Sequence, residues 1–358
     1  MGDMALSRLA LYSPRPSVRV DGADNRQLAD ALLSMAMREQ EGGMSSLEMA
    51  IGAHGPRDDG SVGLLYEDER LIKLGTRLTL LFGDTAIFEG MVSAIELAID
   101  SEGPPRLLLQ AEDAAQRARL RRRSVVHEQL SLAEIARRLA ADLGLSPVIS
   151  GFDQSRELEV QFNESDLAFL RRLLAREGGD MQVSGRELQV APRGQLPRHA
   201  VSLQMHSQLR KLSAVADLAD QVSELRVTGF DFAAGQTLAA SGSAATLGPG
   251  RGRTGAQLLQ QVFGAREQLS SHRLALSQAE AQALARAEFE QRARRFVRID
   301  GICEGNPALR VGGRLSLIDV SPRFDNDYEI SACTHRFDTR RGYETEFRAE
   351  GAYLGEPA

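Results

Sequence analysis

The chain has 358 residues, of which 42% are hydrophobic and only 5% are aromatic, with no tryptophan. This length suits two or three domains, whose cores must be built mainly from aliphatic side chains. The 49 acidic residues outnumber the 43 lysines and arginines, giving a net charge of −6, which argues against nucleic-acid binding because such proteins usually carry a basic surplus.

The chain carries no recognisable targeting segment. Residues 1–11 contain no basic stretch followed by an apolar run, so we expect no secretory signal. No stretch of the sequence approaches the roughly 18 apolar residues of a membrane span. We therefore expect a protein that is made and folded in the cytoplasm and that, if it leaves the cell, leaves as part of an assembly.

The first third of the chain has mainly β-type patterns. Alternation over 17–20 predicts a strand, and Leu28, Ala31, Leu32 and Met35 at helical spacing predict a helix over 27–38. A half-buried strand is expected over 47–51. Between residues 74 and 110, three apolar runs separated by Gly83-Asp84 and Pro104-Pro105 predict an antiparallel meander.

The middle of the chain has an α/β pattern. Ser131 and Glu134 form a capping-box sequence that begins a helix, and Gly144 ends this helix. A strand is predicted over 158–162, followed by a helix that begins near 163–166 and ends at Gly178-Gly179. Two short strands over 181–183 and 187–190 follow.

The last part of the chain returns to β-type patterns. A strand is predicted over 223–232, and the Gly-, Ser- and Ala-rich segment 239–255 predicts a flexible loop. Ser277 and Glu280 suggest a second capping box, with a helix that runs to about Arg295. Strands are expected from Phe296 to about Tyr353.

Two distant segments resemble each other. Residues 75–81 (GTRLTLL) match 312–318 (GGRLSLI), and 92–94 (VSA) match 330–332 (ISA), with one residue of difference in the spacing. β-Hairpins share many features by chance, so coincidence remains the alternative. A true repeat predicts two similar β domains, one early and one late in the chain.

A cluster of five arginines follows the first β segment. The arginine patch consists of Arg117, Arg119, Arg121, Arg122 and Arg123. It can be read as a docking surface for an acidic partner or as a solvated linker between domains. The absence of interleaved aromatic residues makes it a poor platform for nucleic acid.

The segment 160–173 (VQFNESDLAFLRRL) carries the most specific motif. It resembles the late control protein D family of phage tail hubs, which includes the baseplate hub of T-even phages and the N-terminal half of type VI secretion spike proteins. The residues that fit the family pattern are Gln161, Asn163, Glu164, Ser165, Asp166, Phe169, Leu170, Arg172, Leu173, Gly178 and Gly179.

The resemblance extends over most of the chain. Residues 227–231 (VTGFD), the Ala-rich helix 279–289 and the segments 309–312, 328–330, 335–338 and 342–345 also look like family features. Spike proteins of the fused type continue after the hub into a further binding domain and a needle. This chain stops at Ala358, so we expect a hub alone, with the needle as a separate polypeptide.

The family resemblance implies two barrel-like β domains in each chain and three chains in a ring. Six similar domains could then match a sixfold tail tube on one side and a threefold central spike on the other. The implied partners are further copies of the chain, the tail tube protein, the spike or needle protein and the baseplate wedge proteins. No membrane and no specific nucleic acid is implied.

The motif also has a purely architectural interpretation. Asn163 or Ser165 can cap the following helix, while Glu164 and Asp166 would lie in its first turn, where carboxylates favour the helix dipole. The alternative is a carboxylate pair for acid–base catalysis. No nucleophile motif accompanies it, and the Gly-rich segment 248–254 departs from a phosphate-binding loop in its spacing and lacks the lysine.

Cysteine and histidine give no sign of a metal site or a disulfide framework. Cys303 and Cys333 are the two cysteines, and we expect two reduced, buried thiols, although sequence cannot exclude a bond between them. None of the six histidines stands at ligand spacing from another histidine or a cysteine. We therefore predict no metal, no cofactor and no catalytic residues.

These observations together predict an α+β fold. It should contain two similar antiparallel β-barrel-like domains flanking an α/β middle segment, assembled as a pseudo-sixfold trimeric ring. The expected boundaries are 1–118, 119–198 and 199–358, with the Gly-rich loop and long helix of 240–295 inserted in the last domain. The predicted function is the structural hub of a contractile tail baseplate; a cell-wall hydrolase or carbohydrate-binding tail protein is the alternative.

Overall fold

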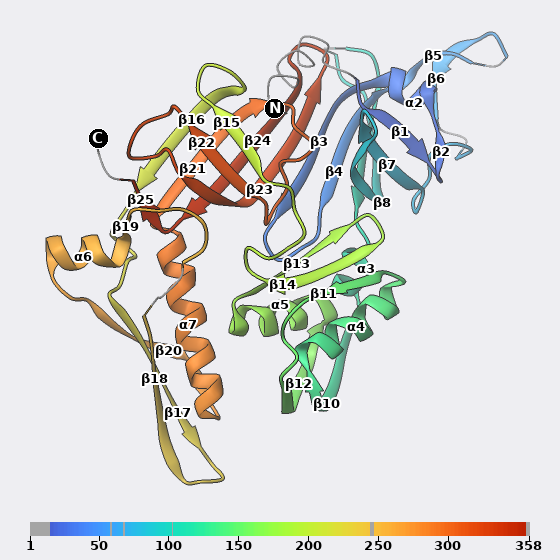
Figure 1. Cartoon of the computed structure of the whole chain (residues 1–358). Helices are drawn as coiled ribbons and strands as arrows, with labels where there is room; N and C mark the ends of the chain where they lie inside the picture. Colours follow the sequence, from blue (N-terminus) through green and yellow to red (C-terminus); the bar gives the residue numbers. More distant parts are fainter. Residues whose placement is uncertain (1–14, 58, 67–68, 102, 244–246, 356–358) are drawn as a thin grey trace.

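The computed structural model describes residues 15–57, 59–66, 69–101, 103–243 and 247–355. The N-terminal segment 1–11, for which we predicted no signal, lies outside this part. The chain is mostly β-structure with several helices, as expected for an α+β protein (Figure 1). Within the described ranges, no helix is long and apolar enough to cross a membrane.

One large sheet contains strands from both the early and the late part of the chain (Figure 1). The early strands are β1 (Ser17–Val20), β2 (Ala23–Asp24), β3 (Leu32–Gln40), β4 (Ser46–Gly52), β7 (Arg77–Phe82), β8 (Thr85–Ala98) and β9 (Arg106–Glu112). The late strands are β15 (Val201–Gln204), β16 (Leu209–Ala216), β21 (Val297–Glu304), β22 (Arg314–Ile318), β23 (Asp327–Asp338) and β24 (Gly342–Gly351).

The sheet is open rather than closed. Its hydrogen-bonded order is β16-β21-β24-β23-β3-β4-β9-β8-β7-β1-β2, with β22 also paired to β23 and β15 paired to β22. Among the described residues, neither the early nor the late strands close on themselves, because the end strands of each set do not pair with each other. The early end strand β3 instead pairs with β23 of the late strands. The expectation of two separate barrel-like domains is therefore corrected to two halves of one continuous sheet.

The predicted N-terminal helix is wrong beyond Ala31. Helix α2 (Arg26–Ala31) ends there, and Leu32 begins strand β3. Met35 and Met37 are buried in alternation with less buried neighbours, and β3 pairs with β4 on one side and β23 on the other. These long-range pairings decide the conformation of a segment whose apolar spacing suits either a helix or a strand. The predicted strand at 47–51 and the meander of β7, β8 and β9 are confirmed.

The predicted repeat is present in the strand pairing. Taken in chain order, the early strands β1, β3, β4, β7, β8 and β9 pair in the order β1-β7-β8-β9-β4-β3. The late strands β15, β16, β21, β22, β23 and β24 pair in the corresponding order β15-β22-β23-β24-β21-β16. The two halves differ in one respect, because β1 runs antiparallel to β7 whereas β15 runs parallel to β22. We call these sets the early half and the late half.

Local irregularities coincide in the two halves. The β8–β9 register shifts between Val92 and Ala94, and the β23–β24 register shifts between Ile330 and Ala332. At each shift a serine hydroxyl donates across the ladder, from Ser93 to the Gln110 carbonyl at 3.4 Å and from Ser331 to the Arg348 carbonyl at 3.5 Å. Chance similarity between hairpins would not reproduce a bulge at the same place in the same strand order.

The middle segment lies below the sheet in Figure 1. It comprises α3 (Ala115–Leu120), β10 (Arg122–Ser131), α4 (Leu132–Leu143), β11 (Ser146–Ile149), β12 (Ser155–Ser165), α5 (Asp166–Glu177), β13 (Gly179–Ser184) and β14 (Glu187–Pro192). The predicted capping box of Ser131 and Glu134 is present, and α4 ends at Gly144 in the left-handed region with φ 70°. Helices α4 and α5 share a core of leucine, alanine and Phe169.

The late half carries an inserted arm between β16 and β21. The arm comprises β17 (Glu224–Asp231), β18 (Gln236–Gly242), β19 (Arg253–Thr254), α6 (Gly255–Phe263), β20 (Glu267–Ala275) and α7 (Gln278–Arg294), and α7 packs on the β18-β17-β20 sheet (Figure 1). Two small hairpin strands, β5 (His54–Pro56) and β6 (Val62–Leu64), and the terminal β25 (Tyr353–Leu354) complete the fold.

The predicted flexible loop over 239–255 is only partly correct. Strand β18 continues through Gly242, and a Cβ at this position would lie 2.1 Å from the carbonyl oxygen of Ala285 in α7. The small residues therefore allow a helix to approach the sheet closely, which composition alone does not distinguish from flexibility. Residues 244–246 lie outside the described part. The predicted domain boundaries at 118 and 198 stay a prediction.

Candidate functional site

The family motif lies at the junction of β12 and α5. Ser165 is the N-cap of α5, and its hydroxyl accepts a hydrogen bond from the Ala168 amide at 3.2 Å. The amide of the Gln161 side chain donates to Asp166 at 2.8 Å and to the Glu164 carbonyl at 2.9 Å. These contacts hold the strand end against the first turn of the helix.

Both motif carboxylates are bound by arginines. Asp166 accepts two hydrogen bonds from Arg123, at 2.6 and 2.8 Å, and Glu164 pairs with Arg172 at 3.0 Å. Glu164 lies in β12 and not, as expected, in the first turn of α5. With each carboxylate held by a cation, neither is placed as a free acid or base, so the geometry supports the architectural interpretation.

The remaining motif residues close the core of the middle segment. Phe169 and Leu170 are buried, and the guanidinium of Arg172 lies 5.2 Å from the centre of the Phe169 ring. Asn163 adopts a positive φ of 44°, and its carbonyl accepts a hydrogen bond from Arg122 at 3.0 Å. Asn163 therefore shapes the strand end, while Ser165 caps the helix.

The arginine patch is partly used within the chain. Arg123 is half-buried between Asp142 and Asp166, while Arg119 pairs with Glu112 at 3.4 Å. The remaining contacts of the patch are weaker or lead to the backbone: Arg121 lies 3.9 Å from Asp142, Arg122 donates to the carbonyl of Asn163, and Arg117 lies 4.0 Å from the sulfur of Met91. Docking through the patch stays a prediction.

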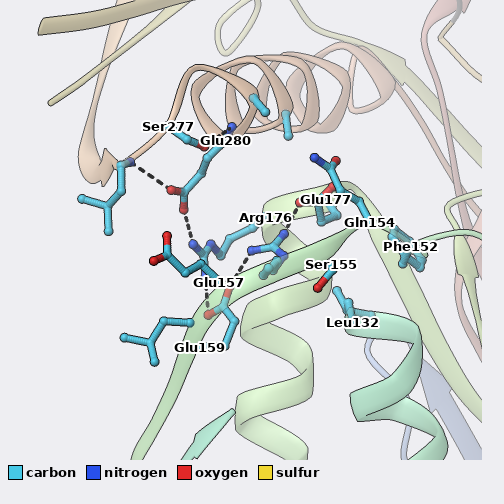
Figure 2. A pocket seen from close by; sticks show the side chains of 15 residues that line it. Leu132, Phe152, Gln154, Ser155, Glu157, Glu159, Arg176, Glu177, Ser277 and Glu280 are labelled. Atoms are coloured by element: carbon cyan, nitrogen blue, oxygen red, sulfur yellow. Dashed lines mark hydrogen bonds and ion pairs between the residues drawn. The ribbon is translucent and has the colours of Figure 1, made fainter. Parts of the chain in front are cut away.

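A cleft of about 320 Å³ lies between the middle segment and α7 (Figure 2). Its lining residues come from α4, the start of β12, the end of α5 and the first turn of α7: Leu132, Phe152, Gln154, Ser155, Arg156, Glu157, Leu158, Glu159, Arg176, Glu177, Leu276, Ser277, Ala279, Glu280 and Ala283. A cleft at such a junction is the default place to look for a ligand site.

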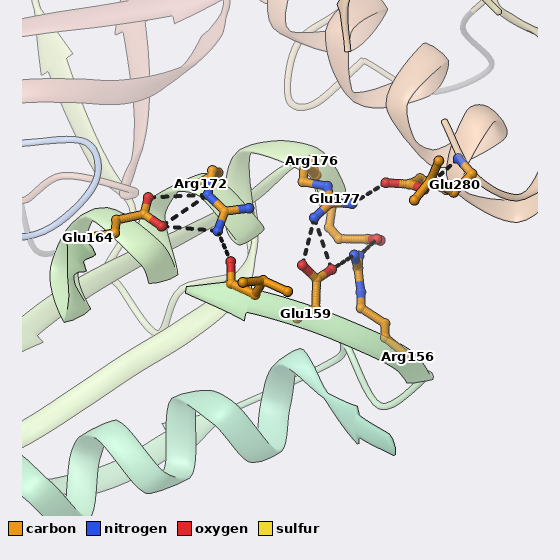
Figure 3. Close-up of polar contacts among 9 residues, drawn as sticks. Arg156, Glu159, Glu164, Arg172, Arg176, Glu177 and Glu280 are labelled. Atoms are coloured by element: carbon orange, nitrogen blue, oxygen red, sulfur yellow. Dashed lines mark hydrogen bonds and ion pairs between the residues drawn. The ribbon is translucent and has the colours of Figure 1, made fainter. Parts of the chain in front are cut away.

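The charges of the cleft form a bridging network (Figure 3). Arg176 binds Glu159 at 2.9 Å and reaches across the cleft to Glu280 of α7. Arg156 binds Glu159 at 2.5 Å and also pairs with Glu177. Because Glu159, Glu177 and Glu280 are each held by an arginine, the network joins the arm to the middle segment and leaves no free acid–base pair among them.

The second predicted capping box is only half formed. The Ser277 hydroxyl accepts a hydrogen bond from the Glu280 amide at 3.2 Å and so caps α7. The Glu280 carboxylate instead accepts from the Leu276 amide at 2.9 Å and pairs with Arg176. The ion pair across the cleft thus replaces the reciprocal hydrogen bond of a capping box.

The Gly-rich segment 248–254 also serves the fold. Thr254 forms a capping box with Gln257 at the start of α6. Gly252, at a φ of 116°, lies against the end of the chain, where a Cβ would meet the Leu354 carbonyl oxygen at 2.2 Å. These glycines permit close backbone contact, in agreement with our conclusion that this is not a phosphate loop.

A buried polar cluster joins the two halves of the sheet, and none of its members was predicted from the sequence as a site residue. Arg310 donates to both carboxylate oxygens of Glu39 at 2.9 Å, and the thiol of Cys333 lies 3.4 Å from Glu39. His335 lies 2.8 Å from the hydroxyl of Tyr343 and 3.0 Å from the carbonyl of Leu309. The signal in the sequence is that Glu39 continues the alternation of the buried residues Met35 and Met37, but the helix predicted over 27–38 obscures this alternation.

Burial and charge set the ionisation of this cluster. Burial by itself would raise the pKa of Glu39, but the adjacent Arg310 outweighs it and lowers this pKa to about 2. Burial lowers the pKa of His335 to about 4, and Arg310 adds to the effect. Burial also raises the pKa values of Cys303 and Cys333, which are free thiols as predicted.

Metal binding finds no support in this arrangement. Over the described ranges, no group of three or more histidine, cysteine, aspartate or glutamate side chains could hold a metal ion. The polar clusters are instead arginine–carboxylate networks at the junctions between parts of the fold. What these residues can do chemically is to fix the relative positions of the early half, the late half, the middle segment and the arm.

Several solved structures share this fold. A 43 kDa tail protein of prophage MuSo2 from Shewanella oneidensis matches with a TM-score of 0.69 and 11% identity, covering 94% of this chain and 97% of that one. A tail protein from Neisseria meningitidis matches with a TM-score of 0.68 and 13% identity, covering 95% and 99%. At these identities the likeness concerns the fold.

A third solved structure with this fold comes from a type VI secretion system. An Escherichia coli component of the type VI secretion system, described as structurally similar to T4 bacteriophage tail proteins gp27 and gp5, matches with a TM-score of 0.61 and 13% identity. The match covers 95% of this chain and 79% of that one. Among curated proteins, none matches the sequence.

The sequence itself identifies the family. Residues 65–340 match the family model of the phage tail baseplate hub (GPD), a span that includes the motif of β12 and α5, the arm and most of the late half. Hub proteins of this family are structural tail components and not enzymes, in keeping with the arginine-bound carboxylates described above. The chain belongs to the phage tail baseplate hub (GPD) family.

Proposed function

We propose that this baseplate hub protein is a homotrimeric symmetry adapter between a sixfold tail tube and a threefold central spike. Three chains that each carry two similar halves present six similar units to the tube and three identical units to the spike. The observation that carries the proposal is the repeated strand order of the early and late halves, with bulges at Ser93 and Ser331 in corresponding positions.

The partners follow from the same proposal. They are two further copies of this chain, a tail tube protein, a spike or needle protein and the wedge proteins of the baseplate in a phage or a phage-like injection particle. Any docking role of the arginine patch would belong to Arg117, Arg119, Arg121 and Arg122, whose side chains are exposed, because Arg123 is committed to Asp166.

The mass in solution tests the proposal. One chain has a mass of 39.0 kDa, and light scattering should give about three times this value, either for the chain alone or after co-expression with the spike protein. A chain that stays monomeric in both cases would contradict the symmetry adapter.

Substitution of the motif carboxylates distinguishes a structural hub from a wall-active hydrolase. Replacing both Glu164 and Asp166 by alanine should impair folding or assembly, because Arg172 loses its carboxylate partner and Arg123 keeps only the exposed Asp142. Circular dichroism and light scattering measure these losses. A variant that folds and assembles normally but has lost an ability to clear cell-wall material would favour the hydrolase instead.

A further inference from the structure

The two halves of the chain meet at a single antiparallel strand pair. Strand β3 of the early half pairs with β23 of the late half from Ser34 opposite Asp338 to Gln40 opposite Ala332. This is a head-to-tail contact, because the two halves contribute different strands of the same repeated unit. A contact of this kind leaves two strand edges unpaired, one on the late-half copy of β3 and one on the early-half copy of β23.

The unused copies are β16 and β8. Strand β16 occupies in the late half the place of β3, and among the described strands it pairs only with β21. Strand β8 occupies in the early half the place of β23. Its first part pairs with β7 and its second part with β9, and the edge that corresponds to the β3-binding edge of β23 has no strand beside it in the described part of the chain.

The exposed fractions of the side chains show that this edge of β8 is uncovered within one chain. In β23 the side chains at the junction, Cys333, His335 and Phe337, are 2%, 0% and 4% exposed. Their counterparts by the register of the repeat are Ile95 and Leu97 near the end of β8 and Ile99 just after its last residue, and these are 37%, 40% and 65% exposed. In the early half, three aliphatic side chains at alternate positions are therefore exposed to solvent. The corresponding side chains of the late half are buried against β3.

We propose that β16 of one chain pairs antiparallel with the free edge of β8 in a second copy, repeating the β3–β23 junction between chains. The bulges fix the register, because β3–β4 shifts between Leu32 and Ser34 and β16–β21 shifts between Leu209 and Lys211. Transferring the β3–β23 register places Leu212, Ala214 and Ala216 opposite Ile99, Leu97 and Ile95.

The side chains brought together in this way are compatible. Each of the three pairs on that face is aliphatic, so every contact removes apolar surface from water. On the same register Lys211 comes opposite Asp100, which lies two residues beyond the end of β8 and pairs with Arg106 at 2.6 Å, so no two like charges are opposed there. A register shifted by one residue would bring β16 polar side chains such as Ser213 to the apolar row instead.

This inference rests on the proposed function, since it names the surface through which the trimer would form. The pairing satisfies two open strand edges in every chain and can continue from copy to copy until the ring closes, which leaves none of these edges exposed. The occupant is thus a second copy of this chain.

Engineered cysteines test the register directly. Oxidation of the variant with Leu97→Cys and Ala214→Cys should link neighbouring chains, since opposed residues on adjacent strands meet the distance requirement of a disulfide. The matched control, Leu97→Cys with Ser213→Cys, should not link, because Ser213 points to the other face of the sheet. Ile99 with Leu212 and Ile95 with Ala216 provide two further in-register pairs.

A charge on the apolar row gives an independent test. Leu97→Asp should abolish the trimer in light scattering while leaving the circular dichroism spectrum of the folded chain unchanged, since the side chain is exposed within one chain. Val62→Asp, on the exposed strand β6, is the control and should leave the trimer intact.

The outcomes distinguish this inference from the proposed function. Chains that form trimers but cross-link at none of the three in-register pairs, and that tolerate Leu97→Asp, would overturn the strand pairing and leave the symmetry adapter standing. Chains that remain monomeric even with the spike protein would overturn both. Linkage of the in-register pairs without the control pair, together with loss of the trimer in Leu97→Asp, is the expected result.

Discussion

The early and late halves of this baseplate hub have the same strand order but different surroundings. The late half contributes β23 to the internal junction, where a buried cluster of Glu39, Arg310 and His335 lies. The early half presents the corresponding edge of β8 with three exposed aliphatic residues. One repeated unit can therefore form a buried, polar junction at one copy of an edge and present an apolar surface at the other copy.

The inserted arm is the second difference between the halves. In the early half, a short turn over 41–45 joins β3 to β4, whereas in the late half the whole arm separates β16 from β21. The arm leaves and returns at the same place, since the Asp217 amide donates to the Phe296 carbonyl at 2.9 Å. An insertion at a hairpin of this kind leaves the sheet pairing of the repeat intact.

The largest effect is expected at the internal junction. Arg310→Met leaves the carboxylate of Glu39 buried without its cation, which should lower the free energy of unfolding by about 3–5 kcal/mol. Chemical denaturation measures this loss. The control is Arg336→Met on β23, which breaks a half-exposed pair with Glu346 and should cost no more than about 1 kcal/mol. Equal losses in the two variants would show that the junction cluster does not hold the halves together.

The pH dependence of the free energy of unfolding should reveal the lowered pKa of His335. Its folded pKa of about 4 lies below the ordinary value of 6.5, so between these values the unfolded chain binds a proton that the folded chain does not. Stability is therefore complete above pH 6.5 and falls as the pH is lowered toward 4, by up to about 1.4 kcal/mol per pH unit from this residue.

The variant His335→Gln isolates this contribution. Burial raises the pKa of Asp113 to about 6, and this group gains stability as the pH falls through 6, so the two residues partly oppose each other in the whole protein. The difference between the unfolding curves of the wild type and His335→Gln removes the Asp113 contribution. The same slope in both proteins between pH 4 and 6.5 would contradict the assignment.

A smaller effect on stability is expected at the turn over 41–45, which joins β3 to β4 in the early half. Glu41 binds Arg193 of the middle segment at 2.6 Å and Arg294 of α7 at 2.6 and 2.7 Å. Glu41→Gln should lower the free energy of unfolding by about 2 kcal/mol and speed proteolysis of the arm. Glu48→Gln, in an exposed pair with Arg38, is the control and should change neither.

The smallest expected effect is the difference in stability between alanine substitutions at the two bulge serines, Ser93 and Ser331. Ser331 is buried and Ser93 is exposed, although both donate to the equivalent carbonyl. Ser331→Ala should cost about 1 kcal/mol in unfolding free energy, and Ser93→Ala less than about 0.5 kcal/mol, because water replaces the partner of an exposed hydroxyl. Equal costs would mean that the bulges are stabilised by the backbone alone.

Much of this fold could be predicted from local patterns. The capping box at Ser131, the N-cap at Ser165 and the glycine ends of α4 and α5 are short-range features whose physical cause lies within a few residues. The repeat was visible because a glycine, an alternating strand and a bulge serine recur with nearly constant spacing. The motif of α5 was found for the same reason.

The rest depends on contacts between distant residues. Whether Leu32 to Met37 forms a helix or a strand is decided by β4 and β23, which no local spacing shows. The ion pair of Glu39 with Arg310 joins residues 271 positions apart. The composition around Gly242 predicts a loop. The small residues there are explained instead by their close contact with α7, which is a distant segment of the chain.

The symmetry adapter is tested most directly by an electron-microscopic image of the assembled ring, viewed along its axis. We expect six similar lobes of density where the large sheet lies, because early and late halves alternate, and three lobes where the arms lie, because each chain carries one arm. Density without six similar lobes at the radius of the sheet, or a ring with a number of chains other than three, would contradict the symmetry adapter.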